Sequence, residues 1–290
     1  MINEVARKRI SQMIDYIESH LDRKMSLDHF ADVAMFSKYY LFRLFKLETG
    51  ETILRFVKRL KMERAYRRIL MDRSVNIEDV SMELGYSSCS NFSRDFRLFF
   101  GMSPSEVRVD SGLSVRGALS GEEKFPVAFK GIEVYPDRYV AYLKVTKGYQ
   151  PDAIIASFMD LFDLAFRENF KVSQAVGLPC NDPDRTPAGK CIYDTCLVID
   201  KPQGRLADYP CNFKTVKGGC YAVFRFEGNK YQFPLAWNYI YGKWLVENDY
   251  QLDDAPRLEV FDHLDGEVSE VLKACLCLPV KPQNQKRVRE

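Results

Sequence analysis

A repeat within the first 110 of its 290 residues constrains this chain more than any other feature. Residues 27–37 match residues 77–87 at an offset of fifty, and, after one inserted residue, residues 37–50 match residues 88–101. Each copy has the apolar spacing of a short helix, a tight turn, and a second helix that begins after a serine and ends at a glycine. The repeat therefore predicts two helix-turn-helix units in one chain.

The second helix of each copy has an apolar face and a more polar face. The apolar face is predicted to pack inward through Leu41, Leu44, Phe45, Phe92, Phe96 and Phe99. The outward residues are Lys38, Tyr39, Phe42 and Arg43 in the first copy and Cys89, Ser90, Asn91 and Arg94 in the second. Ser88, the N-cap of the second copy, is a further candidate for contact with DNA. A helix that recognises DNA places its first turns in the major groove, so these outward residues are candidates for base contact. Two copies in one chain would reach successive major grooves, about 34 Å apart, without a dimer.

A basic stretch joins the two copies. Residues 55–73 hold eight lysines and arginines against only Glu63 and Asp72, with apolar residues interleaved at helical spacing. This pattern predicts one long helix with an apolar stripe and a basic face. The basic face is either an ordinary solvated surface or an element that follows DNA phosphates. The net charge is +3 over residues 1–110 and −1 over residues 111–290, so the small total of +2 does not argue against nucleic acid.

The most specific pattern of this region lies in its second copy. It runs Val80-x-x-x-Leu84-Gly85-Tyr86-x-Ser88-x-x-x-Phe92-x-Arg94-x-Phe96-x-x-x-x-Gly101-x-x-Pro104-x-x-x-Arg108, and it follows Lys58-x-x-Lys61-Met62-x-x-Ala65. With these motifs, residues 6–109 resemble the DNA-binding domain of the AraC/XylS family of transcription regulators. The resemblance implies sequence-specific binding to double-stranded promoter DNA, activation of transcription, and RNA polymerase as a protein partner.

The resemblance also implies which residues contact bases. They are Tyr39, Phe42 and Arg43 in the first copy and Cys89, Ser90, Asn91 and Arg94 in the second. Phe42 and Cys89 are poor hydrogen-bonding groups, which leaves contacts such as one with a thymine methyl. For Arg43 and Arg94 the alternative to base recognition is a phosphate contact or an ion pair within the protein.

The sequence changes character after residue 110. Residues 111–122 have the Ser/Gly content of a linker, and strand-like runs rich in Val, Tyr and Phe then alternate with helical stretches. A weaker repeat, at an offset of about eighty, relates residues 140–148 to residues 221–228. Each half is expected to run strand, helix, strand, strand, with a groove along a pseudo-twofold axis. We expect an all-α double helix-turn-helix domain over residues 1–110 and a linker over 111–122. An α+β domain should follow over 123–282, with an antiparallel pseudo-twofold sheet and two helices on one face, and residues 283–290 should form a tail.

Several short motifs of the second domain occur in a fixed order. They are Gly177-Leu178-Pro179, Asp182-Pro183-x-x-Thr186-Pro187, Cys191-x-Tyr193-Asp194-x-Cys196, Gly218-Gly219-x-Tyr221-Ala222-Val223, Trp244-Leu245, Leu258-Glu259-Val260-Phe261 and Leu278-Pro279-Val280. In these residues the domain resembles the GyrI-like effector-binding domain found in multidrug-responsive regulators. The resemblance implies a pocket for an amphipathic or cationic small-molecule effector.

Glu259 is the candidate charged residue of that pocket. It lies in an alternating strand, so its side chain points either into an aromatic cavity or towards solvent. A buried, unpaired carboxylate is costly, and a lipophilic cation would relieve that cost with the help of cation–π attraction. The candidate aromatic walls are Tyr142, Tyr193, Phe224, Trp237, Tyr241, Trp244 and Phe261, and for each an ordinary core position is the alternative.

The remaining chemistry of the sequence is sparse. Eight cysteines without a CxxC pair and three scattered histidines have no metal-ligand spacing, so we expect free thiols, no metal and no cofactor. No apolar run approaches the ~20 residues of a membrane span, and no signal peptide is evident. These features predict a cytoplasmic protein that does not contact membranes.

Three functions remain in competition. The leading hypothesis is a ligand-responsive transcription regulator that is not an enzyme, since no Ser-His-Asp or Cys-His arrangement is evident. The first alternative follows from GyrI-like relatives that hydrolyse small electrophilic toxins, with Glu259 as base and Tyr193 as its partner. The second alternative is a ligand-independent module that acts through a protein partner such as RNA polymerase.

Overall fold

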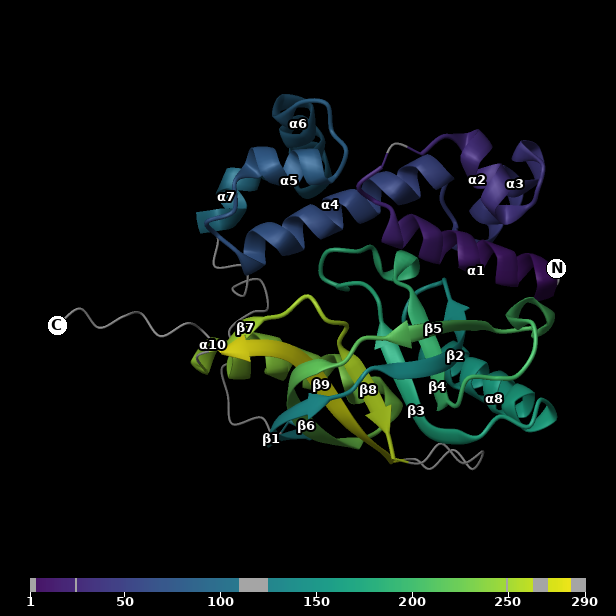
Figure 1. The fold of residues 1–290 in the computed structure, drawn as a ribbon. Helices are drawn as coiled ribbons and strands as arrows, with labels where there is room; N and C mark the ends of the chain where they lie inside the picture. The colour runs from purple at the N-terminus through teal and green to yellow at the C-terminus, as the bar shows by residue number, and fades with distance from the viewer. Residues whose placement is uncertain (1–3, 24, 110–124, 249, 263–270, 283–290) are drawn as a thin grey trace.

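The computed structural model describes residues 4–23, 25–109, 125–248, 250–262 and 271–282, and consists of a helical domain and a sheet domain (Figure 1). The predicted linker (111–122) and tail (283–290) lie outside the described residues. The helical domain contains α1 (Glu4–Ser19), α2 (Leu27–Ala34), α3 (Lys38–Thr49), α4 (Ile53–Met71), α5 (Ile77–Glu83), α6 (Cys89–Phe100) and α7 (Pro104–Val109).

Both predicted helix-turn-helix units are present, as α2–α3 and α5–α6 with α4 between them (Figure 1). The serine before each second helix caps it, and Ser88 Oγ accepts a hydrogen bond from the backbone N–H of Asn91 at 3.2 Å. Both helices end at a left-handed glycine, Gly50 with φ 71° and Gly101 with φ 75°. The local residue chemistry therefore sets the length of the second helix in each unit.

The bases of α4 have three different surroundings and do not form one face. Arg59 is buried, with 4% of its surface exposed, and it pairs with carboxylates. Lys58 pairs with Asp95 of α6 at 2.9 Å. Arg64, Arg67 and Arg68 border a crevice between the domains, together with Arg73, which follows the helix. The predicted long helix is confirmed, but its single basic face is not.

In the described part of the chain, the sheet domain has nine strands in one antiparallel sheet. The strands are β1 (Val127–Tyr135), β2 (Arg138–Val145), β3 (Val172–Pro179), β4 (Tyr193–Ile199), β5 (Asn212–Val216), β6 (Gly219–Gly228), β7 (Tyr250–Leu252), β8 (Leu258–Phe261) and β9 (Leu272–Pro282). The helices are α8 (Pro151–Arg167), η1 (Ala188–Lys190), η2 (Leu206–Asp208), η3 (Lys230–Gln232), α9 (Phe233–Tyr239), η4 (Ile240–Trp244) and α10 (Leu245–Glu247).

The strand order has the predicted pseudo-twofold symmetry. It runs β1-β6-β9-β8 in one half and β5-β2-β4-β3 in the other, and the halves meet where β8 pairs with β3. Each half contains the expected strand, helix, strand, strand, as β2-α8-β3-β4 and as β6, α9 to α10, β8, β9. Each edge strand, β1 or β5, directly precedes one half in the chain but pairs with the other half.

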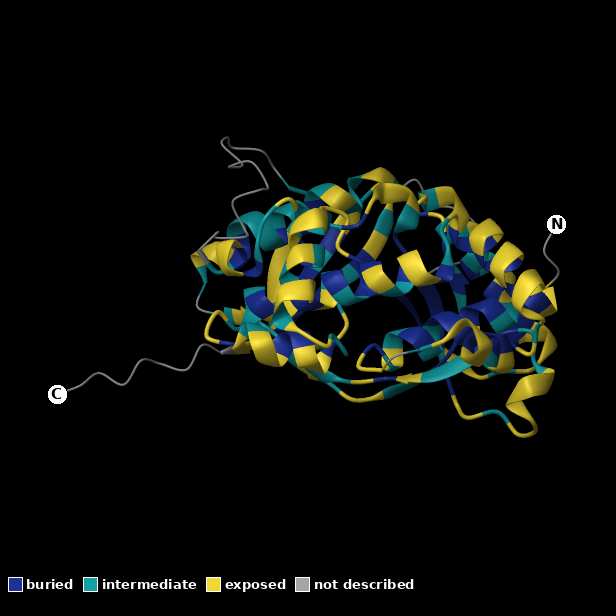
Figure 2. Ribbon diagram, turned by 90° about the horizontal axis from the view of Figure 1, so that it is seen from above, coloured by how far each residue is buried: buried dark blue, intermediate teal, exposed yellow. Residues whose placement is uncertain are grey.

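The two faces of the sheet have separate hydrophobic clusters. Residues of α8 and of α9 to α10 pack on one face, where Phe158, Trp237 and Phe261 belong to the same cluster. On the other face, Leu258 and Val260 of β8 belong to a second cluster. Figure 2 shows the resulting pattern, in which helices expose their outer sides and bury their inner sides. Both helices therefore cover one face of the sheet, as the sequence predicts, and Glu259 points towards that face.

Candidate functional site

The outer side of α3 and α6 carries the residues predicted to contact DNA. The exposed members are Lys38, Tyr39, Phe42, Arg43, Ser88, Ser90, Asn91 and Arg94, whereas Cys89 is half-buried. Tyr39 protrudes, with 80% of its surface exposed. Lys38 pairs with Asp28 of α2. Neither Arg43 nor Arg94 has an ion pair within the described residues, so both guanidinium groups are available to a ligand outside the chain.

A cavity of about 480 Å³ lies in the sheet domain between α8, α9 and the strands. Four predicted residues line it, namely Tyr193, Trp237, Glu259 and Phe261. The other lining residues include Tyr149, Ile154, Phe158, Pro179, Cys191, Phe233 and Arg257. Most of these side chains are aromatic or aliphatic, while Glu259 and Arg257 contribute opposite charges, which suits an amphipathic ligand.

Glu259 is buried in this cavity and is not unpaired. Its Oε2 atom accepts a hydrogen bond from the Tyr193 hydroxyl at 2.6 Å, and its Oε1 atom accepts one from Trp237 Nε1 at 2.8 Å. Burial raises the pKa of Glu259, while the hydrogen bonds from Tyr193 and Trp237 and the positive charge of Arg257 lower it in part. The expectation of an unpaired carboxylate is therefore wrong, although its desolvation is confirmed.

Gly177 makes room for the Tyr193 hydroxyl. It lies on β3 opposite Glu259 of β8. A Cβ atom at Gly177 would lie 1.7 Å from the Tyr193 hydroxyl oxygen, which no side chain can tolerate. The glycine of the Gly177-Leu178-Pro179 motif thus allows Tyr193 to reach across the sheet to Glu259.

The four other predicted aromatic walls lie outside this cavity. Phe224 and Trp244 pack edge-to-face against each other, with ring centroids 4.9 Å apart, in the core of the helix-covered face. Tyr241 lies beside Trp237 but borders a separate cavity of about 320 Å³ between the domains. Tyr142 belongs to the opposite face, and its hydroxyl donates to Asp15 of α1. Tyr142 is therefore a contact between the domains.

Arg257 and Tyr149 are among the cavity residues that the sequence did not predict. Arg257 stacks its guanidinium group over Trp237 at 5.5 Å and donates from Nε to the backbone carbonyl of Pro179 at 3.1 Å. Tyr149 packs edge-to-face on Tyr193, with ring centroids 6.0 Å apart. The sequence signal for Arg257 was its position two residues before Glu259, because side chains two apart in an extended segment point to the same side. Tyr149 lies in a loop without periodicity, and only the fold brings it to the cavity.

The described residues contain no group of three or more His, Cys, Asp or Glu side chains arranged to hold a metal ion. All eight cysteines are free thiols, buried or half-buried. None of the described helices combines the length and the apolar character that crossing a membrane requires.

The two domains define a DNA-binding regulator with a small-molecule module, and comparison with known proteins gives the same class. Residues 132–281 match the GyrI-like small molecule binding domain, and residues 30–109 match a helix-turn-helix domain. The chain belongs to the GyrI-like family, and its first domain is of the AraC/XylS type. It is an AraC-type transcription regulator with a GyrI-like small-molecule-binding domain.

Individual relatives match the first domain. The regulatory protein SoxS of Salmonella typhimurium is 33% identical over 99 residues, which are 34% of this chain and 92% of SoxS. The probable transcriptional regulator LumQ of Photobacterium leiognathi is 32% identical over 105 residues, which are 36% of this chain and 42% of LumQ. A solved AraC-type regulator from Chromobacterium violaceum is 26% identical, with a TM-score of 0.34, and the match covers 41% of this chain and all of that one.

Proposed function

We propose that the chain is a transcription activator whose affinity for promoter DNA changes when an amphipathic cation occupies the cavity at Glu259. The observation that carries this proposal is a desolvated carboxylate within an aromatic cavity, in the same chain as two exposed DNA-recognition helices. A bound cation would pair with the carboxylate, and its apolar part would lie against Trp237, Phe158 and Phe261.

The charged residues of the cavity lining narrow the ligand class. They are Glu259, Asp184, Arg257 and Lys230, and Lys230 pairs with Asp152. Glu259 uses one hydrogen bond on each oxygen, so a cation has access to the remaining lone pairs without displacing Tyr193 or Trp237. Arg257 binds backbone carbonyls, so its own charge is partly engaged by the protein. A monovalent cation with a large apolar body fits these surroundings better than a small hydrated ion or an anion does.

The test combines DNA selection with a ligand titration. A DNA site is selected from a random pool with the full chain, and its Kd is measured with and without tetraphenylphosphonium, a lipophilic monocation. Binding of the probe is followed by tryptophan fluorescence, to which Trp237 of the cavity and Trp244 contribute, and transcription is measured with purified RNA polymerase. We expect probe binding that Glu259→Gln weakens, together with a changed Kd for DNA. Equal DNA affinity and equal transcription with a saturated cavity would refute the switch.

A second candidate function is hydrolysis, which the 2.6 Å contact between the Tyr193 hydroxyl and Glu259 favours. We propose binding without turnover, because most of the lining is aromatic or aliphatic and suits the apolar body of a ligand. Incubation with a small electrophile such as an aryl epoxide, followed by product analysis, tests this. Turnover by the wild type that disappears in Glu259→Gln would establish the hydrolase instead.

A further inference from the structure

The loop between β3 and β4 (residues 180–192, the β3–β4 loop) contacts the cavity and the DNA-binding domain at once. Cys191 and Tyr193 line the cavity, whereas Ile192 between them is fully buried in the hydrophobic core of the helical domain. Cys180 packs against that same core. Consecutive side chains of an extended segment point to opposite sides, so one short stretch of backbone serves both sites.

Asn181 connects the cavity wall to the helical domain. The hydroxyl of Tyr149 donates to the Asn181 carbonyl at 2.5 Å and accepts from the Asn181 N–H at 2.7 Å, and Arg257 donates to the same carbonyl. Tyr149 and Arg257 both line the cavity. The Asn181 side chain donates to Glu63 at 3.0 Å and accepts from the Ile192 N–H at 2.7 Å. A buried residue with all these groups engaged cannot move alone.

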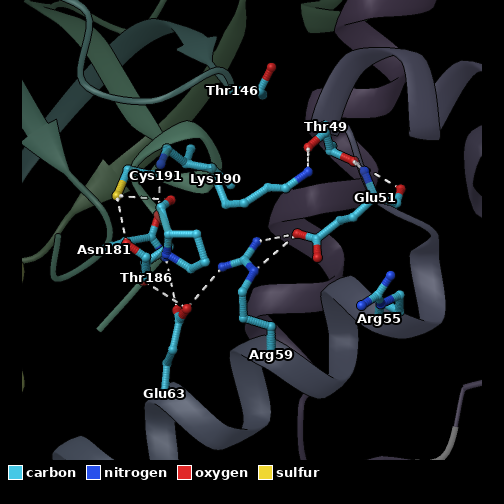
Figure 3. Close-up of polar contacts among 12 residues, drawn as sticks. Thr49, Glu51, Arg55, Arg59, Glu63, Thr146, Asn181, Thr186, Lys190 and Cys191 are labelled. Carbon is cyan, nitrogen blue, oxygen red and sulfur yellow. Dashed lines mark hydrogen bonds and ion pairs between the residues drawn. The ribbon is translucent and has the colours of Figure 1, made fainter. Parts of the chain in front are cut away.

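Glu63 of α4 accepts hydrogen bonds from the loop and, through Arg59, connects the loop to the corner between α3 and α4 (Figure 3). Its Oε1 atom accepts from the Thr186 hydroxyl at 2.7 Å and from Arg59 at 3.1 Å. Arg59 in turn donates from Nη2 to Glu51 at 2.7 Å and from Nε at 3.0 Å. Glu51 lies in the two-residue connection after Gly50, which ends the DNA-recognition helix α3. A continuous polar path thus joins the cavity wall to that helix.

The loop has a second contact with α3 itself. Lys190 donates to the carbonyl oxygen of Thr49, the last residue of α3, at 3.1 Å (Figure 3). This bond satisfies a carbonyl group that lacks a partner within the helix. The end of α3 is therefore held by the same loop that lines the cavity.

We infer that the β3–β4 loop transmits occupancy of the cavity to the DNA-recognition helix α3, with Asn181 and Thr186 as the donors and Glu63 as the receiving group. This inference rests on the proposed function, since it names how that site regulates DNA binding. A ligand that displaces Tyr149 or Arg257 shifts Asn181, and Glu63 then redistributes its hydrogen bonds between the loop and Arg59. The effect on DNA is limited to the ligand's differential affinity for the two arrangements.

The first experiment measures coupling between probe and DNA. In the wild type we expect saturating tetraphenylphosphonium to change the Kd for the selected DNA by about 5- to 150-fold, the usual range of allosteric coupling. Thr186→Val removes one donor to Glu63 without changing shape, and Asn181→Asp replaces the other donor by a repelling carboxylate. Neither residue lines the cavity at Glu259. Both variants should keep probe affinity within about threefold and reduce the coupling to about twofold or less.

Thr146→Val is the matched control. The Thr146 hydroxyl contacts Glu48 of α3, with its backbone carbonyl at 3.0 Å and its Oε1 atom at 3.2 Å. The control therefore loses buried hydrogen bonds to the same helix that do not pass through the β3–β4 loop. It does not contact Asn181, Thr186 or Glu63. We expect it to keep the wild-type coupling. Unchanged coupling in Thr186→Val and Asn181→Asp, or an equal loss in Thr146→Val, would overturn the inference.

The second experiment needs no ligand. Tyr149→Phe removes the hydroxyl that holds Asn181, and a double-mutant cycle with Thr186→Val is read as Kd for DNA. We expect the two effects to differ from additivity by at least about twofold, whereas Tyr149→Phe with Thr146→Val should be additive. Additive effects in both cycles would overturn the relay. If tetraphenylphosphonium fails to bind or to affect DNA, the proposed function fails, and this cycle still decides whether the loop connects the two sites.

Discussion

Gly177 and Tyr193 depend on each other for the position of one hydroxyl group. We predict that Gly177→Ala displaces the Tyr193 hydroxyl from Glu259, because the new methyl group would lie 1.7 Å from its oxygen. Overpacking and the lost hydrogen bond to a carboxylate should lower the free energy of unfolding by about 2–4 kcal/mol. Chemical denaturation measures this. Gly189→Ala is the control, because a Cβ there contacts nothing within 4 Å, and an equal loss in both variants would contradict the explanation.

Glu259 should make stability depend on pH. Burial raises its pKa in the folded state, so on raising the pH the unfolded chain loses this proton first, and folding becomes less favourable through that window. Glu259→Gln keeps an acceptor for Trp237 and presents an amide N–H to the Tyr193 hydroxyl oxygen, but it cannot ionise. We expect it to be more stable than the wild type at pH 7, by on the order of 1 kcal/mol, and equal to it near pH 4.

Denaturation curves between pH 4 and pH 8 test this prediction. The exposed Glu247→Gln serves as the control, and its difference from the wild type should stay flat. Other ionisable groups cancel in the comparison of variant with wild type. A Glu259→Gln difference that does not grow with pH would show that the carboxylate is solvated in the folded chain.

The sequence predicts some of the cavity residues for physical reasons that can be stated. Glu259 and Phe261 alternate with Leu258 and Val260, so strand geometry alone places them on one face. Arg257 precedes β8, so its spacing from Glu259 did not by itself fix its direction, which depends on carbonyl groups of β3 and of the β3–β4 loop. Tyr142 was assigned to the cavity although β2 turns it towards α1, a choice that needs the strand order.

At the scale of elements, local residue chemistry predicted the helices well. α3 and α6 begin and end at the serines and glycines of the repeat, since capping depends on neighbouring residues alone. The surroundings of α4 were not predictable in the same way. Arg59 is buried because Glu51 and Glu63 accompany it, and the crevice beside Arg67 exists only once the sheet domain packs nearby.

The outer face of α6 is predicted to contact DNA through Arg94. Arg94 is exposed and has no ion pair within the described residues, so we expect it to contact a base in the major groove. Arg94→Ala should weaken binding to the selected DNA site by about 1–3 kcal/mol and relax the preference at one base position. Selection from a random pool with the variant measures both effects. Arg73→Ala, which faces the crevice between the domains, should keep the wild-type preference, and an unchanged profile for Arg94→Ala would refute the assignment.

At the scale of the whole molecule, a buried ion cluster joins the two domains. Lys144 of β2 lies 2.8 Å from Asp194 of β4 and 3.1 Å from Asp15 of α1, and Lys214 of β5 completes the group. Burial alone would lower the pKa of Lys144, but Asp15 and Asp194 raise it, so its charge is kept. A buried charge is stable only while its partners are present, and Asp15 comes from the helical domain. We therefore expect the two domains to fold as one unit.

Removing the α1 end of this cluster should uncouple the domains. Asp15→Ala leaves Lys144 with Asp194 and with the more distant charge of Glu18 of α1, but it removes the direct ion pair with the helical domain and the acceptor of the Tyr142 hydroxyl. We expect the free energy of unfolding to fall by about 1–3 kcal/mol, the cost of unsatisfied buried polar groups.

Thermal unfolding is followed by the fluorescence of Trp237 and Trp244, which report the sheet domain, and by far-ultraviolet circular dichroism, which is weighted towards the helical domain. In the wild type the two transitions should coincide, because a domain that unfolded alone would remove the partners of the charges buried in the other domain. In Asp15→Ala they should separate, whereas Asp22→Ala, whose side chain is exposed on the same domain, should leave them together. Coincident transitions in Asp15→Ala would mean that the hydrogen bonds of the β3–β4 loop suffice to hold the domains as one cooperative unit.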